Sequence, residues 1–365
     1  MINSYYPLRS LQQGNWLKLI CGASFQHLPS VRNLTLAYAL SGVDCIDVSA
    51  DAAVIASAQA ALKVASLMTK AAQNRGYGIK QLPWLMVSLN AGEDPHFRKA
   101  AFDSTNCPPE CHRPCEQICP AQAIVFERLE DNFSGVLEPN CYGCGRCLPI
   151  CPSQLIKVHS YVVQKEAIAS LVLSQGVDAV EIHTQVGQYA EFANLWTSVK
   201  PWVSKLKLVA ISCPDGEGLI DYLWSIYKLI SPLKSALIWQ TDGRPMSGDI
   251  GDGTTIAAVK LAQKVLKAKL PGYVQLAGGT NRYTVPKLQK LGMLGSNLEG
   301  SRISGVAYGS YARALLSPIL ERLEQLQINK TNEVSTVGLE QEPQLLWEAV
   351  NMAQTLVSQL KPIAC

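Results

Sequence analysis

An α/β fold built as an eight-stranded barrel is predicted by three observations. Eight short runs rich in β-branched and apolar residues recur along the chain, and each is followed by a helical pattern. Strands of that composition are typical of parallel sheets that are buried on both faces. Residues 1–90 and 159–326, which carry these runs, together approach the ~250 residues usual for a (β/α)8, TIM-like barrel. A doubly wound open sheet is the alternative.

The individual elements can be placed in chain order. The expected strands are residues 19–24, 45–49, 84–90, 178–184, 206–212, 235–240, 273–277 and 303–308. The clearest helical patterns are residues 30–41, 52–68, 164–174, 219–230 and 255–268. The helix at 52–68 is the most apolar, but Gln59 and Lys63 interrupt it, which favours a buried amphipathic helix over a membrane span. A last amphipathic helix, residues 344–360, is expected to pack on the barrel or on a partner.

A cysteine-rich segment interrupts the barrel pattern after the third strand. The chain is therefore divided into residues 1–90 (strands one to three), 91–158 (the insertion), 159–326 (strands four to eight) and 327–365 (a linker and the last helix). Loops that follow barrel strands all emerge at the C-terminal face, where barrel active sites lie. The insertion is thus expected over the mouth of the barrel.

The insertion contains two runs of four cysteines. The second has the bacterial ferredoxin spacing for a [4Fe–4S] cluster, namely Cys141-x2-Cys144-x2-Cys147-x3-Cys151-Pro152. The first has the same ending but one extra residue in each of its first two gaps, namely Cys107-x3-Cys111-x3-Cys115-x3-Cys119-Pro120. Their third and fourth cysteines are each 32 residues apart, which indicates an internal duplication.

In such a pair, the fourth cysteine of each run ligates the cluster of the other run. Two [4Fe–4S] clusters are therefore expected, one on Cys141, Cys144, Cys147 and Cys119, and its neighbour on Cys107, Cys111, Cys115 and Cys151. The wider gaps make the neighbour the more labile of the two. Zinc is one alternative, but structural zinc usually takes two separated pairs of cysteines. Disulfides are the other, but they belong mostly to small secreted domains, and this long chain starts without a signal peptide.

Two glycine-containing loops are candidates for binding a phosphate. Gly278 and Gly279 follow the seventh strand, and Gly309 and Ser310 follow the eighth. Barrels often bind a phosphate with these loops, because exposed backbone N–H groups and a helix N-terminus attract anions. Residues 305–313 resemble the flavin-phosphate end of flavin-dependent reductase barrels, although Ser310 stands where an arginine commonly follows the glycine. FMN is thus a candidate cofactor; tight turns are the plainer explanation of these glycines.

Polar residues at strand ends are expected to line the barrel mouth. They are Asp47, Ser49, Ser88, Asn90, Glu181, His183, Gln240 and Asp242. Glu181 and His183 are two apart on one strand, so their side chains share a face. Acid–base chemistry and a hydrogen-bonded core histidine both fit His183, and no catalytic residue is assigned.

Further features have plain explanations. Cys213 ends the fifth strand and fits a small buried thiol better than a nucleophile. Three other cysteines, Cys21, Cys45 and Cys365, belong to no motif. The loop at 242–255 is rich in glycine and aspartate, as in a mobile lid or a solvated turn.

The composition bounds the class of protein. The chain is 48% hydrophobic and 17% charged, as in a globular protein with a core. Its 32 basic and 29 acidic residues leave a net charge of +3, which does not favour nucleic-acid binding. No window approaches ~20 uninterrupted apolar residues, so no transmembrane segment is expected. The thiol-rich chain without a leader is expected in the cytoplasm.

The cysteine segment from Asn106 to Pro120, with Cys141 to Pro152, resembles the cyanobacterial light-dependent period (LdpA) family. The barrel-like remainder and the chain length agree with that resemblance. It implies iron–sulfur clusters that report cellular redox state, a proxy for light, to circadian clock proteins as partners. Because no chromophore motif is visible, electrons would arrive from a donor such as a ferredoxin or a quinone.

Three functional hypotheses follow. In a redox sensor, the charge change of a cluster shifts a surface equilibrium that a partner protein recognises. In a ferredoxin-linked, flavin-dependent oxidoreductase, the clusters feed electrons to an active site in the barrel. In a scaffold, the clusters only stabilise the fold.

Overall fold

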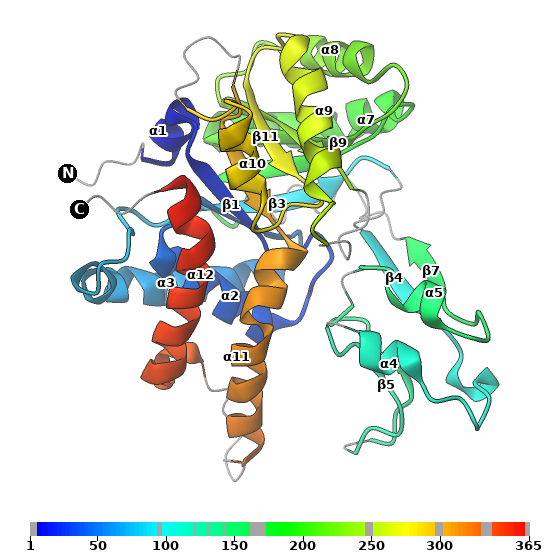
Figure 1. Cartoon of the computed structure of the whole chain (residues 1–365). Helices are drawn as coiled ribbons and strands as arrows, with labels where there is room; N and C mark the ends of the chain where they lie inside the picture. Colours follow the sequence, from blue (N-terminus) through cyan, green and yellow to red (C-terminus); the bar gives the residue numbers. More distant parts are fainter. Residues whose placement is uncertain are drawn as a thin grey trace.

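A computed structural model describes residues 6–92, 97–119, 121–129, 131–141, 143–160, 173–244, 251–295, 302–329 and 338–361. Eight parallel strands close into a barrel (Figure 1), in the order β1 (Trp16–Ile20), β2 (Cys45–Ser49), β3 (Trp84–Asn90), β8 (Ala179–His183), β9 (Leu208–Pro214), β10 (Ala236–Asp242), β11 (Tyr273–Ala277) and β12 (Gly305–Tyr308). β12 pairs with β1, with Gly305 opposite Trp16, and so closes the ring. The predicted barrel is confirmed, and the open-sheet alternative is wrong.

The first strand is the one whose predicted position is wrong. Residues 19–24 were expected, but β1 spans Trp16–Ile20 and the chain leaves the sheet at Cys21. Lys18 interrupts the apolar run of β1 and hides it from a search for apolar segments. The structure buries Lys18 inside the barrel, where its charge has partners. The strands expected at 45–49, 84–90 and 273–277 agree with the structure to the residue.

Helices surround the barrel. In chain order they are α1 (Tyr6–Gln13), α2 (Leu28–Ser41), α3 (Ala52–Asn74), α7 (Tyr189–Val199), the 3-10 helix η3 (Lys200–Lys205), α8 (Leu219–Ile230), α9 (Thr255–Lys267), α10 (Thr284–Lys290) and α11 (Ser310–Asn329). The helix expected at 164–174 lies almost wholly outside the described residues, as does the middle of the loop at 242–255.

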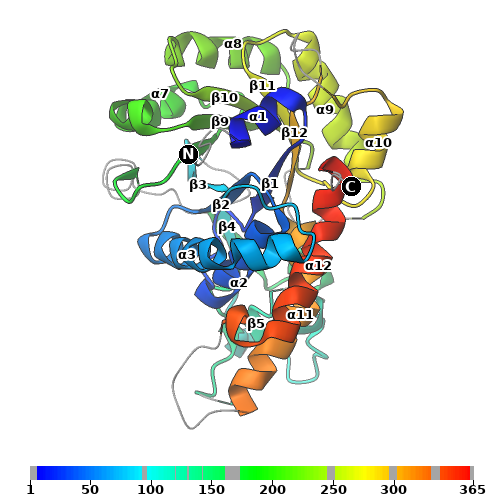
Figure 2. The ribbon, with the colours of Figure 1, turned by 90° about the vertical axis from the view of Figure 1, so that its left-hand side faces the viewer.

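α3 confirms the amphipathic helix predicted at 52–68. Asp51 caps its N-terminus by accepting hydrogen bonds from the backbone of Ala53 and Val54. Small side chains such as Ala58 and Ala61 are fully buried and pack α3 against α2 (Figure 2). Among the described residues, α3 is the one helix long and apolar enough to cross a membrane by length and composition. Because its alanine face packs against α2, α3 is a helix of the barrel's outer layer.

The end of the chain returns to the barrel. The 3-10 helix η4 (Leu339–Gln341) precedes α12 (Pro343–Leu360), whose buried face packs on α2 and α11. Arg32 of α2 forms a two-pronged ion pair with Glu340, and Lys361 Nζ lies 2.5 Å from Asp44 Oδ1. The last helix therefore packs on the outside of the barrel, which was one of the two expectations, the other being a partner.

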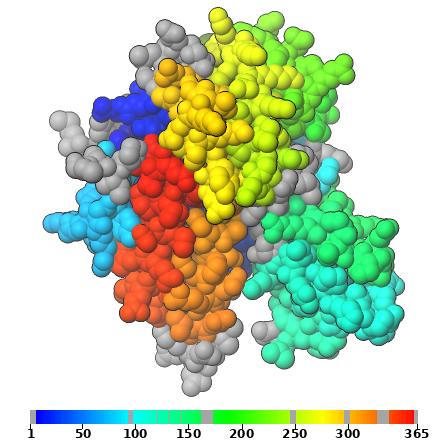
Figure 3. Space-filling view, in the orientation of Figure 1, coloured from blue at the N-terminus to red at the C-terminus, as the bar shows by residue number. Residues whose placement is uncertain are grey.

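The inserted segment forms a separate lobe beside the barrel (Figures 1 and 3). Its elements are β4 (Arg98–Ala101), η2 (Ser104–Asn106), α4 (Pro114–Ile118), β5 (Ile124–Val125), β6 (Gly135–Val136), α5 (Cys147–Ile150) and β7 (Lys157–Ser160). β4 pairs with β7 and β5 with β6, both antiparallel.

The duplication seen in the cysteine spacing extends to the backbone of this lobe. Arg113 and Gly145 are left-handed, with φ of 51° and 76°. Gln122 and Gln154 are left-handed too, with φ of 47° and 52°. Both pairs have the offset that relates the cysteine runs. A positive φ is uncommon for a residue other than glycine, and three of these four are not glycine, so the two matched pairs indicate that the halves share one local fold.

Candidate functional site

Four cysteines surround one small cavity in the inserted lobe. They are Cys119, Cys141, Cys144 and Cys147, and apolar side chains such as Ala123, Ile124 and Val158 complete the wall. Three of these cysteines come from the second run and one from the first. The structure thus brings together the set expected from crosswise pairing. We call this set the inner site.

Backbone N–H groups point at the sulfur atoms of the inner site. Ala100 N donates to Cys141 Sγ at 3.4 Å, and Ala123 N donates to Cys119 Sγ at 3.2 Å. Gly143 and Gly145 have φ of 68° and 76°, so the chain between the cysteines makes turns that side chains disfavour. Hydrogen bonds of this kind tune the charge and potential of iron–sulfur centres. The inner site therefore fits an iron–sulfur group.

The electrostatics of the inner site favour a bound cationic centre. Burial and the neighbouring Cys144, Cys141 and Cys119 raise the pKa of Cys147 to about 12. Burial, with Cys119 and Cys141, also raises the pKa of Cys144. The thiols of Cys144 and Cys147 therefore resist ionisation on their own. A metal centre supplies the positive charge that makes thiolates stable there.

The other four cysteines form a second group, which we call the outer site. Burial, Cys111 and Cys151 raise the pKa of Cys107, and burial raises that of Cys115, with Cys151 and Cys107 adding to the effect. These mutual effects show that Cys107, Cys111, Cys115 and Cys151 lie close together. Cys115 is buried, while the other three are half-buried, so the outer site is nearer to solvent.

Cys151 has the most polar surroundings of the outer group. Burial raises its pKa, but the backbone groups of residues 153–156 outweigh burial and leave the pKa below its ordinary value. A thiolate at this position is therefore stabilised before any metal binds.

A buried lysine connects the inner site to the barrel. Lys99 Nζ donates to Gln26 Oε1 and to the carbonyl of Glu138, both at 2.8 Å. Gln26 belongs to the loop after β1, and its backbone N–H donates to Pro139 O at 3.1 Å. Burial lowers the pKa of Lys99, against the opposing effects of Glu138 and Cys141. The ammonium group thus lies at the joint between lobe and barrel, within electrostatic reach of the inner site.

A second polar cluster fills the barrel interior. Lys18 of β1 forms an ion pair with Glu181 of β8 and lies 3.5 Å from Asp47 of β2. Glu181 also accepts from Gln240 at 2.8 Å and lies 3.1 Å from His183 Nε2. All five side chains are at least nine-tenths buried. Beneath them lies an apolar layer that includes Trp16, Trp84 and Met86.

The upper edge of this cluster faces the mouth. Ser212 Oγ lies 3.3 Å from His183 Nδ1 and donates a hydrogen bond to Asp242. Phe97, at the start of the inserted segment, packs its ring against His183. Polar side chains from five of the barrel strands therefore converge next to Phe97 of the insertion, as expected for the C-terminal face of a barrel.

The two carboxylates bound to Lys18 have opposite pKa shifts. Burial raises the pKa of Glu181, but Lys18 and His183 outweigh burial and lower it to about 2. For Asp47, burial outweighs Lys18 and raises the pKa to about 6, with Glu181 adding to the effect. The pKa of Lys18 is raised above its ordinary value, because the carboxylates outweigh the effect of burial. Lys18 is therefore a permanent ammonium, and Asp47 is the member placed to exchange a proton near neutral pH.

Sequence reasoning identified much of this cluster and missed part of it. The eight residues expected at the mouth are all buried on the barrel strands, namely Asp47, Ser49, Ser88, Asn90, Glu181, His183, Gln240 and Asp242. Lys18, Ser212 and Gln275 were missed. Gln275 Nε2 donates to Gln240 Oε1 at 2.6 Å. The signal that could have found Lys18 is a charged residue in the middle of an otherwise apolar run.

The glycine loops have structural reasons of their own. A Cβ on Gly278 would lie 2.8 Å from Arg244 O, and Gly279 O accepts from Thr254 Oγ1 at 2.7 Å. Arg313 donates to the carbonyls of Ile20 and Cys21, each at 3.0 Å. It also donates to Ser310 Oγ at 2.8 Å, beside Gly309. Tight packing explains these residues, and FMN binding at Gly278, Gly279, Gly309 and Ser310 stays a prediction.

The cysteines outside the two sites that the structure describes are buried. Cys21 and Cys45 have no exposed surface, and Cys213 is 4% exposed. The expectation of a small buried thiol at Cys213 is confirmed. Cys365 lies outside the described residues.

A parallel barrel carrying a duplicated, ferredoxin-like cysteine lobe defines the class: a barrel protein with an iron–sulfur module. The family model described as the LdpA Fe-S cluster-binding domain matches residues 107–162, and the model of the light dependent period A C-terminal domain matches residues 171–359. Light dependent period A of Synechococcus elongatus is 48% identical over 360 residues, covering 99% of this chain and 95% of that protein. The chain belongs to the light dependent period A family.

Solved structures are more distant. A geranylgeranylglyceryl phosphate synthase (GGGPS) from Thermoplasma volcanium aligns over 100% of both chains, with a TM-score of 0.41 and 8% identity. Tryptophan synthase from M. tuberculosis covers 97% of this chain and 96% of its own, with a TM-score of 0.38 and 10% identity. The barrel assignment rests on the strand pairing of the chain itself.

Proposed function

We propose that this protein is a redox-responsive iron–sulfur protein that passes cellular redox state, a proxy for light, to circadian clock proteins. Two [4Fe–4S] clusters would be held crosswise, one at the inner site and one at the outer site. The single observation that carries the proposal is the cavity surrounded by Cys119, Cys141, Cys144 and Cys147. The Fe-S cluster-binding domain of the family supports an iron–sulfur cofactor.

The arrangement of the thiols favours a cluster over a single zinc ion. Zinc needs four ligand atoms about 2.0–2.3 Å from one point. Among the described residues, no three His, Cys, Asp or Glu side chains converge in a way that suits one metal ion. Three cysteines of one run and one of the other around a single cavity suit a group with several iron atoms, each taking one thiolate.

Two features of the lobe support sensing. The outer site is half-buried and therefore accessible to an electron donor such as a ferredoxin or a quinone. The inner site lies near Lys99, whose ammonium bridges the lobe and the loop after β1. When bound, the clusters would supply a change of one electron in local charge. Lys99 is the buried cation placed to transmit such a change to the barrel.

An oxidoreductase is the second candidate function. The observation that favours it is the buried Lys18–Glu181–His183 cluster inside the barrel, which reaches the C-terminal end of β8 at His183. Buried charges are costly, and apolar residues often replace them without loss of stability. Their presence at the face where barrels hold active sites favours a chemical role.

The crosswise arrangement is tested by iron and acid-labile sulfide content in oxygen-free protein. Cys119→Ser and Cys144→Ser should each remove about half of the iron, and the double variant should remove no more, since both belong to one site. Cys119→Ser combined with Cys115→Ser should remove nearly all of it. If that second pair leaves about half, each run holds its own cluster and the crosswise assignment is wrong.

The choice between sensor and enzyme is tested on the same material. Visible and EPR spectra that show reversible reduction without flavin support the sensor. Flavin absorption together with turnover supports the oxidoreductase. Clusters that cannot be reduced reversibly would leave only a scaffold role, and colourless protein that holds zinc would refute the proposal. Clock-protein partners are tested by binding to the oxidised and reduced protein in parallel.

A further inference from the structure

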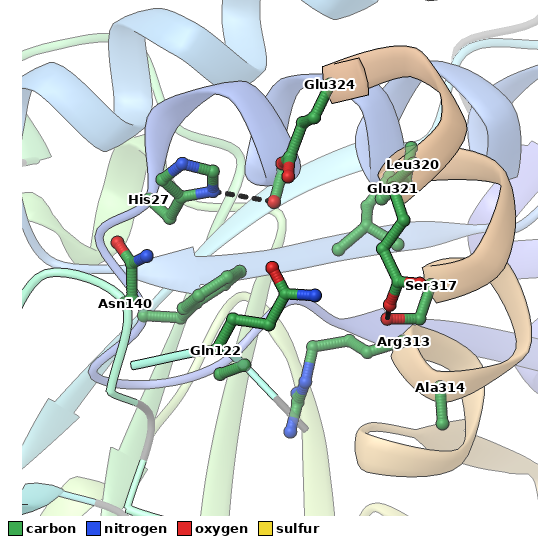
Figure 4. Close-up of a pocket in the computed structure, with 13 residues that line it drawn as sticks. His27, Gln122, Asn140, Arg313, Ala314, Ser317, Leu320, Glu321 and Glu324 are labelled. Atoms are coloured by element: carbon green, nitrogen blue, oxygen red, sulfur yellow. Dashed lines mark hydrogen bonds between the residues drawn. The ribbon is translucent and has the colours of Figure 1, made fainter. Parts of the chain in front are cut away.

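A pocket of about 110 Å³ lies between the barrel and the inserted lobe (Figure 4). We call it the interlobe pocket. Its walls come from the loop after β1 and the start of α2, from α11, and from residues of the lobe that follow Cys119 and precede Cys141. Of the residues described above in the barrel interior and the glycine loops, Arg313 alone lines this pocket. The pocket is therefore distinct from those sites.

The pocket has an apolar part and a polar part. Phe25, Leu34, Leu320 and Ala121 supply apolar surface. The polar lining is His27, Ser30, Gln122, Asn140, Ser317, Glu321 and Glu324, with Arg313 at one end. Figure 4 shows Glu321 and Glu324 on α11 facing His27 and Asn140 across the opening, with Gln122 between them. A ligand with an apolar body and polar ends would match this division.

The lining of the pocket has more acidic than basic side chains. Glu321 accepts from Ser317 Oγ at 3.2 Å, and burial together with Glu321 raises the pKa of Glu324. Burial lowers the pKa of His27, so the imidazole is neutral at pH 7. The one guanidinium, on Arg313, donates to Ile20 O and Cys21 O, below the pocket. A positive group between the two carboxylates would remove their mutual repulsion.

We propose that the interlobe pocket binds a small organic cation, a primary ammonium or guanidinium on a short apolar stem. A water molecule needs roughly 10–15 Å³ of such volume, so the pocket has room for about eight non-hydrogen atoms. The cation would lie between Glu321 and Glu324, with the stem against Leu34 and Leu320. The amide oxygens of Gln122 and Asn140 would accept hydrogen bonds from the other end. A free amine and a lysine or arginine side chain of a partner share this chemistry.

The position of the pocket ties it to the inner site. Ala121 lines both the interlobe pocket and the cavity of the inner site. This part of the inference rests on the proposed function: an added electron at the inner site makes the neighbourhood more negative and strengthens cation binding. By thermodynamic linkage, the bound cation favours the reduced state by the same factor. The interlobe pocket is thereby an effector site of the redox centre.

Calorimetry on the anaerobic full-length protein tests the proposal with 1,4-diaminobutane as the probe and 1-butanol as its neutral counterpart. We expect diaminobutane to bind and butanol to fail. Glu324→Gln and Glu321→Gln should each weaken binding by about tenfold, the loss of one charged hydrogen bond. The matched control is Glu348→Gln, an exposed carboxylate paired with Arg322 of α11, which should leave the affinity within about twofold. Equal binding by wild type and both pocket variants, or equal binding of butanol, would overturn the proposal.

Two further arms separate the sources of the cation and the redox link. A blocked Gly-Lys-Gly peptide that binds more tightly than diaminobutane identifies a side chain of a partner, and the reverse order identifies a free amine. Dithionite-reduced protein should bind the probe more tightly than oxidised protein. Equal affinity in both states refutes the link to the inner site. If protein purified without oxygen contains no iron, the proposed clusters are refuted. Binding of diaminobutane by that same protein would leave the pocket assignment standing.

Discussion

The ring of Phe97 packs edge-on against the imidazole of His183, with 5.5 Å between the ring centroids and 80° between the planes. Phe97 is three residues from Ala100, whose N–H donates to Cys141 Sγ. His183 lies 3.1 Å from Glu181, the partner of Lys18. One short stretch of chain therefore joins the inner site to the charged interior of the barrel.

Loss of this aromatic contact should be costly. Phe97 is 1% exposed, so Phe97→Ala leaves a cavity and should lower the free energy of unfolding by about 3–5 kcal/mol. Urea denaturation measures the change. Phe133→Ala is the control, because Phe133 is 38% exposed and should cost about 1 kcal/mol or less. A small effect at Phe97 would show that the contact does not hold the lobe to the barrel.

Glu181→Gln should destabilise the fold, because the buried positive charge of Lys18 would lose the carboxylate that neutralises it. Breaking a buried ion pair from one side costs about 3–5 kcal/mol, because an uncompensated charge remains. The matched control is Asp215→Asn, which breaks the exposed pair with Lys264 and should cost about 0–1 kcal/mol. Similar costs for the two variants would contradict the buried pairing of Lys18 in β1.

The same cluster predicts opposite pH dependences for its two carboxylates. Glu181 has a pKa lowered to about 2, so its stabilising effect is complete above its ordinary pKa and is lost as the pH falls towards 2. Asp47 has a pKa raised to about 6, so the folded state holds its proton more tightly than the unfolded state does. Its contribution falls as the pH rises through the interval up to about 6.

Asp47→Asn isolates the second of these effects. The variant has no carboxyl to ionise, so its stability relative to wild type should increase between pH 4 and pH 7. Chemical denaturation at several pH values measures this difference. A difference that does not change with pH would mean that the pKa of Asp47 is unshifted.

Lys99→Met tests the joint between lobe and barrel. Gln26 Oε1 and Glu138 O would lose their charged donor, which should cost about 1.5–3 kcal/mol. The midpoint potential of the inner site should fall, since a nearby positive charge favours the reduced state. EPR-monitored redox titration measures the potential. Lys157→Met, at an exposed position of β7, should change neither quantity, and equal effects of the two variants would refute a special role for Lys99.

Much of the candidate site could be predicted because its determinants are local. Three thiolates of each run lie within one tight segment, and the fourth recurs at a fixed offset, so the spacing alone indicated the grouping of Cys119 with Cys141, Cys144 and Cys147. Strands such as β2 and β3 were recognisable because their mostly apolar, β-branched composition is what a sheet buried on both faces requires.

The remaining features depend on the closure of the barrel, which brings distant strands together. Lys18 looks like a break in a strand, and its partners Asp47 and Glu181 become visible only when β1, β2 and β8 lie in one ring. The interlobe pocket likewise joins α11 to residues almost 200 positions earlier in the chain. The sequence by itself determined the cysteine sets and the barrel class, since both follow from short-range spacing and composition. Only the tertiary structure determined which charges are buried together, because long-range packing sets the desolvation and the pairing of each charged group.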